Sequence, residues 1–474
     1  MRTIFFILIC GVFCLSGCEK LLEENPKAIA VETFYKTPDE VEAALNSIYS
    51  PFRAVMTTDY PAQIETYADY GYGKGSYSVL RDYQKLDETN ISRISNIWTL
   101  LYRAVRNANI AIANIPAAEA LNDIQVNNYL AEARFMRGYM YLYLVQCWGG
   151  VPKRTEDNMG ELDVPRSSDQ EIWDLILADL EFAKDNLPLR PRAWGAPSTN
   201  VAKTVLTEVY LHLERYSDAR TMAHEVITSG EFALVPVAVP DDFLKLYGPG
   251  VTHTSEEIFY QKYSRSQGWW WIHYLHAPNS YSGPQGIFAN YSDSENYVLK
   301  NWDRDDLRFQ FNWYPRDVGF GPNTLLCKKF QDTNTPNGSG DVDIPLYRYA
   351  DLLLYFAEAE TRVNGVTSDA LDALNQVHRR AYGYSPLTAS PVDFQADDFS
   401  QQSLLDQIIE ERCYETVFEL KRWNDLKRLG IVKERIKLTK GVDVSDTFLL
   451  WPIPVNETNY NSAIDPRTDQ NPGY

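Results

Sequence analysis

The stretch "AEARFMRGYMYLYLVQCWGGVP", residues 131–152, decides the fold of this chain of 474 residues. With the "NNYL" before it, it forms a long run of apolar and aromatic side chains that we interpret as one helix. Gly149, Gly150 and Pro152 close the run, and glycine and proline commonly follow the end of a helix. The stretch therefore predicts a long helix that stops at Gly149.

Helix signals also lie on both sides of this stretch. Thr37 and Glu40 have the spacing of a capping box, and Ser168 and Glu171 repeat it before a second apolar run. Residues 200–230 contain two helical patterns with a break at Arg215, and they approach a tetratricopeptide (TPR) unit of about 34 residues. Helical patterns resume at residue 345. These signals predict a mostly α protein whose scaffold consists of TPR-like helix hairpins.

Two internal segments do not follow the helical period. Residues 59–92 are rich in tyrosine and glycine, and we expect loop and short strand there. Residues 231–343 are rich in aromatic residues, proline, glycine and asparagine, and a structureless loop of that length is implausible in a compact domain. We expect short strands, turns and packed loops in this second segment. The closing residues 449–474 hold too much proline and asparagine for a helix, and we expect them to wrap over the body.

The N-terminus resembles the leader of a bacterial lipoprotein. Arg2 precedes an apolar run from Ile4 to Leu15, which is too short to span a bilayer comfortably. "LSGC", residues 15–18, follows directly and is similar to a lipobox. We predict a signal peptide over residues 1–17 and lipidation of Cys18, because several acyl chains on one cysteine give stable anchoring without a transmembrane helix. An ordinary secretory signal with an incidental cysteine is the alternative.

Charge and cysteine content exclude some classes of protein. The formal net charge is −19, and a strongly acidic chain repels phosphate backbones, so we expect no nucleic-acid partner. Beyond Cys18 there remain Cys147, Cys327 and Cys413, an odd number that excludes a fully paired disulfide scaffold. No spacing of cysteine and histidine resembles a zinc site, so we predict buried, unpaired thiols and neither metal nor cofactor.

Several blocks, taken in order, resemble the SusD/RagB family of outer-membrane nutrient-binding lipoproteins. Residues 131–152 are similar to its most characteristic block, and "PLYRYADLLLYFAEAE", residues 345–360, resembles a second. "IIEERCYETVFELKRWNDLKRLG", residues 408–430, resembles a third, and the closing "LLWPIP" and "QNPGY" resemble the family's ending. The resemblance covers nearly all of the chain that follows the lipobox.

The resemblance implies an architecture and a role. It implies four TPR-like hairpins as scaffold, with an irregular region of loops and short strands that carries the ligand site. It divides the chain into residues 18–230 and residues 231–474, with the irregular region at 231–343, which together we expect to form one compact unit. It also implies a lipid-anchored cell-surface protein that caps a SusC-type TonB-dependent transporter in the outer membrane and binds ligand without turning it over.

The chemistry of sugar recognition selects candidate residues within the two irregular segments. A sugar ring offers an apolar face to a flat aromatic side chain, and nearby polar groups hold its hydroxyls. The stretch "WWWIHYLHAPNSYSG" and the stretch "ETYADYGYGKGSYSVLRDY" offer this mixture, and the resemblance implies that segments at these positions help to line the ligand face. The predicted ligand-binding residues are Trp269, Trp270, Trp271, Tyr274, His276, Tyr70, Tyr72, Tyr77 and Arg81.

Competing interpretations apply to these and other residues. A strand alternates its faces, so three consecutive indoles cannot share one side, and all three could instead be buried. His273 and His276 have no third ligand placed for a metal. Glu411 and Glu415 lie at helical spacing among apolar residues, where we expect ion pairs between packed helices rather than catalytic acids.

Three functions can be weighed from the sequence. Clustered aromatic residues favour oligosaccharides as the ligand. Peptides, as in the RagB branch, are the alternative within the same architecture. An enzyme such as a glycoside hydrolase would need two carboxylates at a set separation, and no nucleophile motif is present, so we predict that the chain is not an enzyme.

Overall fold

The structure, a computed structural model, describes residues 34–57, 59–267, 275–276, 286–287, 291–317, 321–332 and 340–474. At residue 267 and in the two short pieces 275–276 and 286–287, only the backbone is described. Within these ranges no helix combines the length and the apolar character needed to cross a membrane.

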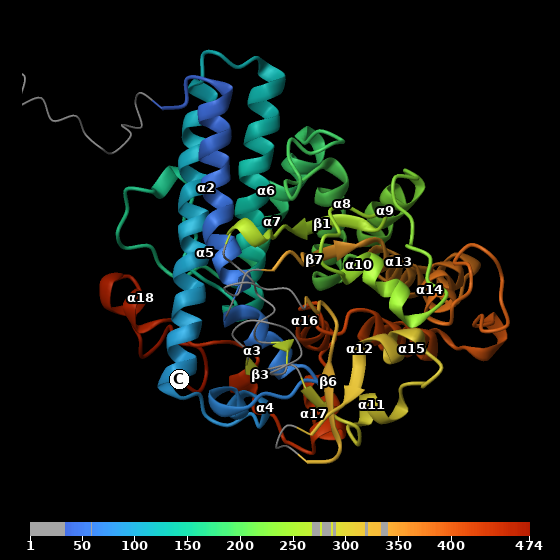
Figure 1. The fold of residues 1–474 in the computed structure, drawn as a ribbon. Helices are drawn as coiled ribbons and strands as arrows, with labels where there is room; N and C mark the ends of the chain where they lie inside the picture. The colour runs from blue at the N-terminus through green and yellow to red at the C-terminus, as the bar shows by residue number, and fades with distance from the viewer. Residues whose placement is uncertain are drawn as a thin grey trace, which may run out of the picture.

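Four long helices form the N-terminal bundle (Figure 1). They are α2 Pro38–Thr57, α5 Glu88–Asn114, α6 Asp123–Trp148 and α7 Asp169–Asn186. α6 packs against the other three, and every residue from Phe135 to Trp148 is buried. A helix that is apolar on nearly all sides belongs in the interior, which explains the long, mostly apolar run of the sequence. At Gly138 an added Cβ would lie 3.1 Å from the Cβ of Asp179, so the glycine permits the close approach of α6 and α7.

Helix hairpins continue the scaffold into the second half of the chain. The elements are α8 Thr199–His212, α9 Tyr216–Thr228, α13 Tyr349–Asn364, α14 Ser368–Ala381 and α15 Gln401–Glu415. α8 packs on α9, α9 on α13, and α13 on both α14 and α15, so the stack passes from one half of the sequence to the other. The predicted mostly helical fold is confirmed, and the predicted break at Arg215 separates α8 from α9.

Both predicted capping boxes are present. The backbone N of Thr37 donates to Oε2 of Glu40 at 2.9 Å, and the backbone N of Glu40 donates in return to Oγ1 of Thr37 at 3.4 Å. Ser168 and Glu171 make the same pair of bonds at the start of α7, at 2.8 and 3.3 Å. These bonds satisfy backbone N–H groups that a helix start leaves without an internal partner.

Shorter elements fill the regions between and beside the hairpins. The short helices are α3 Asp59–Tyr67, α4 Ser78–Arg81, α10 Leu244–Tyr247, α11 Tyr297–Asn301, α12 Leu307–Asn312, α16 Arg422–Arg428, α17 Val432–Lys440 and α18 Val455–Tyr460. The expectation of loop and short strand over residues 59–92 is wrong for α3 and α4, and the first turns of α5 also fall in that range. All of α3 after Asp59 is buried, polar side chains included, so the helix has no solvent-exposed face and its short sequence lacks the pattern of an amphipathic surface helix.

The strands are short and antiparallel. β1 Glu257–Gln261 pairs with β7 Ile344–Arg348, and β2 Leu275–His276 pairs with β3 Gly286–Ile287. β6 Thr324–Cys327 lies between β4 Tyr291–Asp293 and β5 Trp313–Pro315. Between residues 231 and 343 the described part of the chain thus has the expected short strands and turns, and it also has the short helices α10, α11 and α12, which were not expected.

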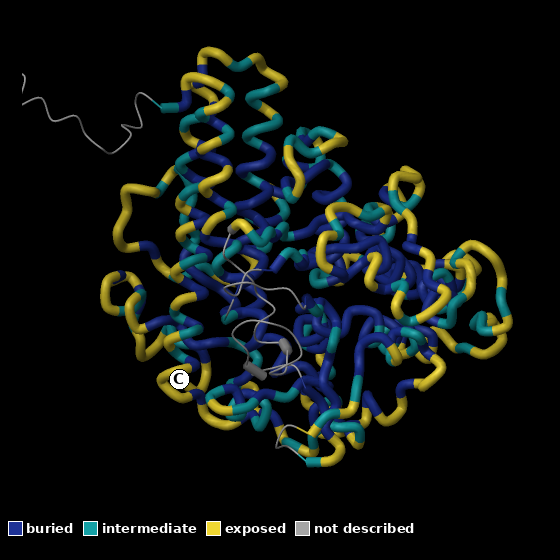
Figure 2. Tube along the Cα trace, viewed as in Figure 1, coloured by how far each residue is buried: buried dark blue, intermediate teal, exposed yellow. Residues whose placement is uncertain are grey.

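One hydrophobic core runs through both halves, and the closing residues fasten to it (Figure 2). The indole of Trp148, at the end of α6, donates from Nε1 to the carbonyl of Pro452 at 2.9 Å. Nδ2 of Asn471 donates to the carbonyls of Trp148 and Trp451 at 2.9 and 2.6 Å. The tail therefore wraps over the body as expected. The three predicted free cysteines, Cys147, Cys327 and Cys413, are buried and unpaired.

Candidate functional site

Part of the predicted ligand site lies outside the described residues. Trp269, Trp270, Trp271 and Tyr274 are among the residues that the structure does not describe, and so is the predicted lipidation site, Cys18. His276 is described only as backbone, in β2. The predictions for these residues remain predictions.

Tyr70 and Tyr77 belong to the core, which corrects the prediction that their rings face a ligand. Each is only 1% exposed. The hydroxyl of Tyr70 donates to Oε2 of Glu65 at 2.7 Å and accepts from the backbone N of Phe418 at 3.0 Å. The ring of Tyr77 is covered by the guanidinium of Arg93, 4.0 Å from the ring centroid. Both tyrosines support the segment from within.

Tyr72 and Arg81 are half-buried, and both contact Tyr291, the first residue of β4. The backbone N of Tyr72 donates to the carbonyl of Tyr291, at the start of β4, at 3.1 Å, and the two ring centroids lie 5.8 Å apart. Nη1 of Arg81 donates to the hydroxyl of the same Tyr291 at 3.4 Å. Two further bonds of 2.6 and 2.7 Å hold the guanidinium on the carboxylate of Asp82. The structure therefore brings these two predicted residues together.

Described residues of both predicted segments lie at the β4–β6–β5 sheet, namely Tyr72 and Arg81 of one segment and β2 of the other. Tyr72 and Tyr314 cover a small buried cluster of Tyr291 and Leu326 on this sheet. β2, which contains His276, contacts β6. We call Tyr72, Arg81, Asp82 and Tyr314, which are all partly exposed, the Tyr72 patch. It combines aromatic rings with a guanidinium and a carboxylate, and such a set can hold the face and the hydroxyls of a sugar.

Sequence reasoning missed Tyr314, Tyr291, Asp82 and Lys440 at this place. Nζ of Lys440 donates to the carbonyl of Thr66 at 3.0 Å and lies 5.5 Å from the ring centroid of Tyr72. Burial lowers the pKa of Lys440 to about 7, against the opposing effect of the Asp69 carboxylate. Asp82 directly follows Arg81 in the sequence, so the same argument from residue type applies to it. The other three come from distant parts of the chain, and no local pattern connects them.

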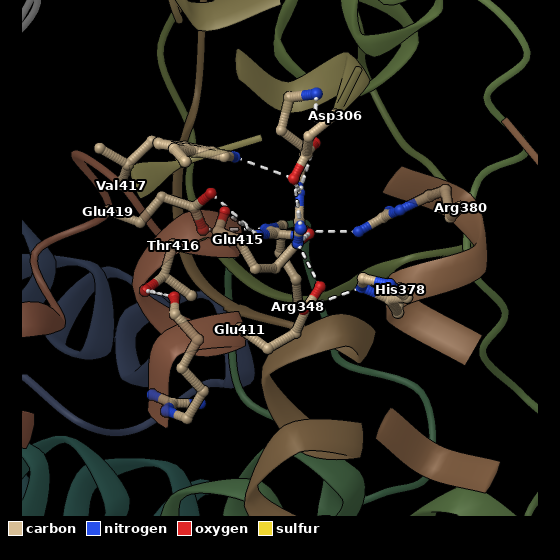
Figure 3. A network of polar contacts seen from close by, with 12 residues as sticks. Asp306, Arg348, His378, Arg380, Glu411, Glu415, Thr416, Val417 and Glu419 are labelled. Carbon is tan, nitrogen blue, oxygen red and sulfur yellow. Dashed lines mark hydrogen bonds and ion pairs between the residues drawn. The ribbon is translucent and has the colours of Figure 1, made fainter. Parts of the chain in front are cut away.

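The acidic residues of α15 form ion pairs between packed elements, as predicted (Figure 3). Oε1 of Glu411 lies 2.8 Å from Nη1 of Arg308, and Oε1 of Glu415 lies 2.9 Å from Nη1 of Arg348. Arg380 also pairs with Glu415. Burial alone would raise the pKa of Glu415, but the surrounding arginines hold that pKa well below its ordinary value. These carboxylates are structural. In the described ranges no group of three or more His, Cys, Asp or Glu residues could hold a metal ion.

Comparisons with known proteins agree with this architecture. A family model described as the SusD family matches residues 258–474, and one described as starch-binding associating with outer membrane matches residues 21–211. A SusD-like protein of Formosa agariphila is 28% identical over 529 residues, which cover 100% of this chain and 99% of that protein.

Two solved structures illustrate the shared fold. Surface glycan-binding protein A from Bacteroides fluxus is 21% identical, with a TM-score of 0.73 over 92% of this chain and 100% of that one. A protein described as a laminarin binding SusD-like protein is also 21% identical, with a TM-score of 0.74 over 93% of this chain and 100% of that one. The fold of this chain is therefore the fold of these proteins.

Proposed function

The chain belongs to the SusD/RagB family, and from this premise we propose that it is an outer-membrane lipoprotein of the cell surface that binds oligosaccharides. It passes them to a SusC-type TonB-dependent transporter for nutrient uptake. The family consists of binding proteins without catalytic activity, so no reaction is assigned to this chain. Cys18, at the end of the lipobox, is the proposed point of attachment to the membrane.

The observation that carries this proposal is that Tyr72, Arg81 and β2, which come from the two predicted segments, lie at one sheet. Tyr72 and Arg81 meet at Tyr291, and the strand of His276 contacts the same sheet. The ligand site we propose consists of the Tyr72 patch together with Trp269, Trp270, Trp271 and Tyr274, which precede β2 in the sequence. Two structurally similar proteins are described as a surface glycan-binding protein and a laminarin-binding protein, which supports a glycan as the ligand.

The mechanism of binding follows from the residue types. A Tyr or Trp ring excludes water from the C–H face of a sugar, which gives affinity with little dependence on sugar identity. The Arg81 and Asp82 pair then offers donors and acceptors to ring hydroxyls, and these directed bonds select among sugars. Because the Arg81 guanidinium is already held by Asp82 and Tyr291, binding costs little side-chain entropy there.

The test is isothermal titration of the purified protein with neutral plant, host and microbial oligosaccharides and with peptide mixtures. Tyr72→Ala should weaken oligosaccharide binding by about tenfold or more, because the aromatic face is lost. Tyr72→Phe should keep most of the affinity. Tyr460→Ala is the matched control, because Tyr460 lies on α18 and is 84% exposed.

Each outcome of this titration decides between ligand classes. Binding of one oligosaccharide class that is lost in Tyr72→Ala, with thermal unfolding unchanged, supports both the function and the site. Binding of peptides alone would replace the oligosaccharide by a peptide ligand, as in RagB. Wild-type protein that binds neither class would contradict the proposed function.

A further inference from the structure

A second polar hollow lies apart from the Tyr72 patch. The loop between α7 and α8 faces β1 across two adjoining cavities of about 410 and 590 Å³. Both cavities are lined by residues 192–196 and by Tyr260, and none of their lining residues belongs to the Tyr72 patch. Ligand-binding pockets typically measure about 300–1,000 Å³, so each cavity has room for a sugar unit.

Trp194 stands between the two cavities and is exposed. It is 67% exposed, whereas every other tryptophan in the described part of the chain is buried or half-buried. An exposed indole at the edge of a cavity offers a flat apolar face to a ligand that enters it. The imidazole of His253 lies against it with the ring centroids 4.6 Å apart, and most of the indole surface remains free.

The backbone presents Trp194 at the tip of a fixed turn. The N of Ala196 donates to the carbonyl of Ala193 at 3.1 Å and closes the turn. Gly195, the third residue, has φ +84°, which side-chain-bearing residues rarely adopt. A Cβ there would also lie 3.2 Å from the carbonyl of Tyr260 in β1. The turn is therefore specified by the sequence and keeps the indole at the edge of both cavities.

Two arginines of this hollow, Arg53 and Arg190, have N–H groups without a hydrogen-bond partner among the described residues. Nε and Nη2 of Arg53 are buried and have no hydrogen-bond partner in the described part of the chain. The guanidinium lies over the ring of Tyr263, 4.7 Å from its centroid, and burial lowers the pKa of Arg53. Arg190 is exposed, and no hydrogen bond or ion pair to another described residue engages it.

The carboxylates of the same hollow are already engaged. Oε2 of Glu257 lies 2.7 Å from Nζ of Lys262, and Oε2 of Glu231 accepts from Nδ2 of Asn200 at 2.9 Å. Arg192 is neutralised by Glu132 at 2.8 Å. Asn200 is neutral, so Glu231 keeps its charge, but among the described residues no carboxylate lies within ion-pair distance of Arg53 or Arg190. Two guanidinium groups without an ion-pair partner, in a chain whose net charge is −19, point to an anion that comes from outside.

We propose that this hollow is a second saccharide site, which binds an acidic sugar unit. The Trp194 indole covers the apolar face of the ring, while Arg53 and Arg190 take the carboxylate or sulfate group that the sugar carries. This inference rests on the proposed function, because it treats the chain as a glycan-binding protein. It adds acidic glycans as a ligand class, whereas the argument for the Tyr72 patch applies to neutral sugars.

The experiment titrates the purified protein with oligosaccharides matched in length that are neutral, uronate-bearing or sulfated. Trp194→Ala should lower the affinity for acidic oligosaccharides by about tenfold or more. Arg190→Gln should lower it less and should leave neutral oligosaccharides unaffected. Added salt should weaken acidic binding only. Arg103→Gln, at an exposed position on α5, and Tyr460→Ala are the controls.

The outcomes separate this site from the proposed function. Acidic binding that survives Trp194→Ala and Arg190→Gln at wild-type strength overturns the second site. So does wild-type protein that binds neutral oligosaccharides only, and in that case the function stands. If no saccharide binds at all, both proposals fail. A preference for the uronate or the sulfate series identifies which anionic group the arginines hold.

Discussion

At the scale of single residues, Lys440 is a half-buried lysine whose amine lies beside the candidate site. Burial lowers its folded-state pKa to about 7, from the ordinary 10.5. Between these two values the unfolded chain keeps a proton that the folded protein has released. The free energy of unfolding therefore rises with pH across this window, and below pH 7 the cost of burying the charge is fully present.

Replacing this amine should remove that pH dependence. We expect wild-type stability, measured relative to Lys440→Met, to rise by on the order of 3 kcal/mol between pH 7 and pH 10. Denaturant unfolding of both proteins at several pH values measures the difference, in which the other titrating groups cancel. Parallel stability curves for the two proteins would show that the Lys440 amine titrates normally.

The sequence predicts the position of some residues of the proposed ligand site and not the burial of others. Tyr72 and Arg81 were selected by residue type, and the structure places them together. Tyr70, only two positions from Tyr72, is buried because Glu65 and Phe418 take its hydroxyl. Composition identifies a segment rich in aromatic rings, but the burial of a ring such as Tyr70 depends on contacts with residues as distant in the sequence as Phe418.

At the scale of elements, α15 joins several parts of the fold through its buried carboxylates. Glu411 and Glu415 lie one turn apart and therefore on the same face. They face Arg308 of α12, Arg348 at the end of β7 and Arg380 of α14 (Figure 3). These ion pairs hold α12, β7 and α14 in fixed positions relative to α15. Charges taken out of water are tolerated only while each keeps its partner.

Removing one charge of this network should be costly. Glu415→Gln removes the carboxylate charge that pairs with both Arg348 and Arg380. We expect a loss of about 3–5 kcal/mol in the free energy of unfolding. Glu295→Gln is the matched control, because its pair with Lys300 is about 60% exposed on both sides. We expect about 1 kcal/mol or less there. Urea unfolding measures both, and equal losses would refute a structural role for the network.

Elements differed in how well the sequence predicted them. The sequence predicts α7 because Ser168 and Glu171 mark its start and apolar residues recur on one face. It does not predict α3, which is short and buries its polar side chains together with its apolar ones, so no exposed polar face marks the helix. Pairing between short strands such as β4 and β6 joins distant residues, and no local pattern specifies it.

At the scale of the whole molecule, residues 18–230 and 231–474 interlock. Asp69 pairs with Arg422 at 2.7 Å, and the ring of Tyr67 stacks on Trp423 with centroids 5.0 Å apart. α9 packs on α13 across the same divide. Each half alone would expose the core surface that the other covers and would leave Asp69 buried without its partner. The two parts are therefore expected to fold as one cooperative unit.

The last prediction follows from this shared core. Residues 34–230 and residues 231–474, expressed separately, should each lack a cooperative thermal transition, because the apolar area that they bury together is exposed in isolation. Co-expression should restore a complex that melts in one step, and the intact chain should do the same in calorimetry. Circular dichroism and calorimetry measure this. Two separate transitions in the intact chain, or one half that folds alone, would show that the halves are independent domains.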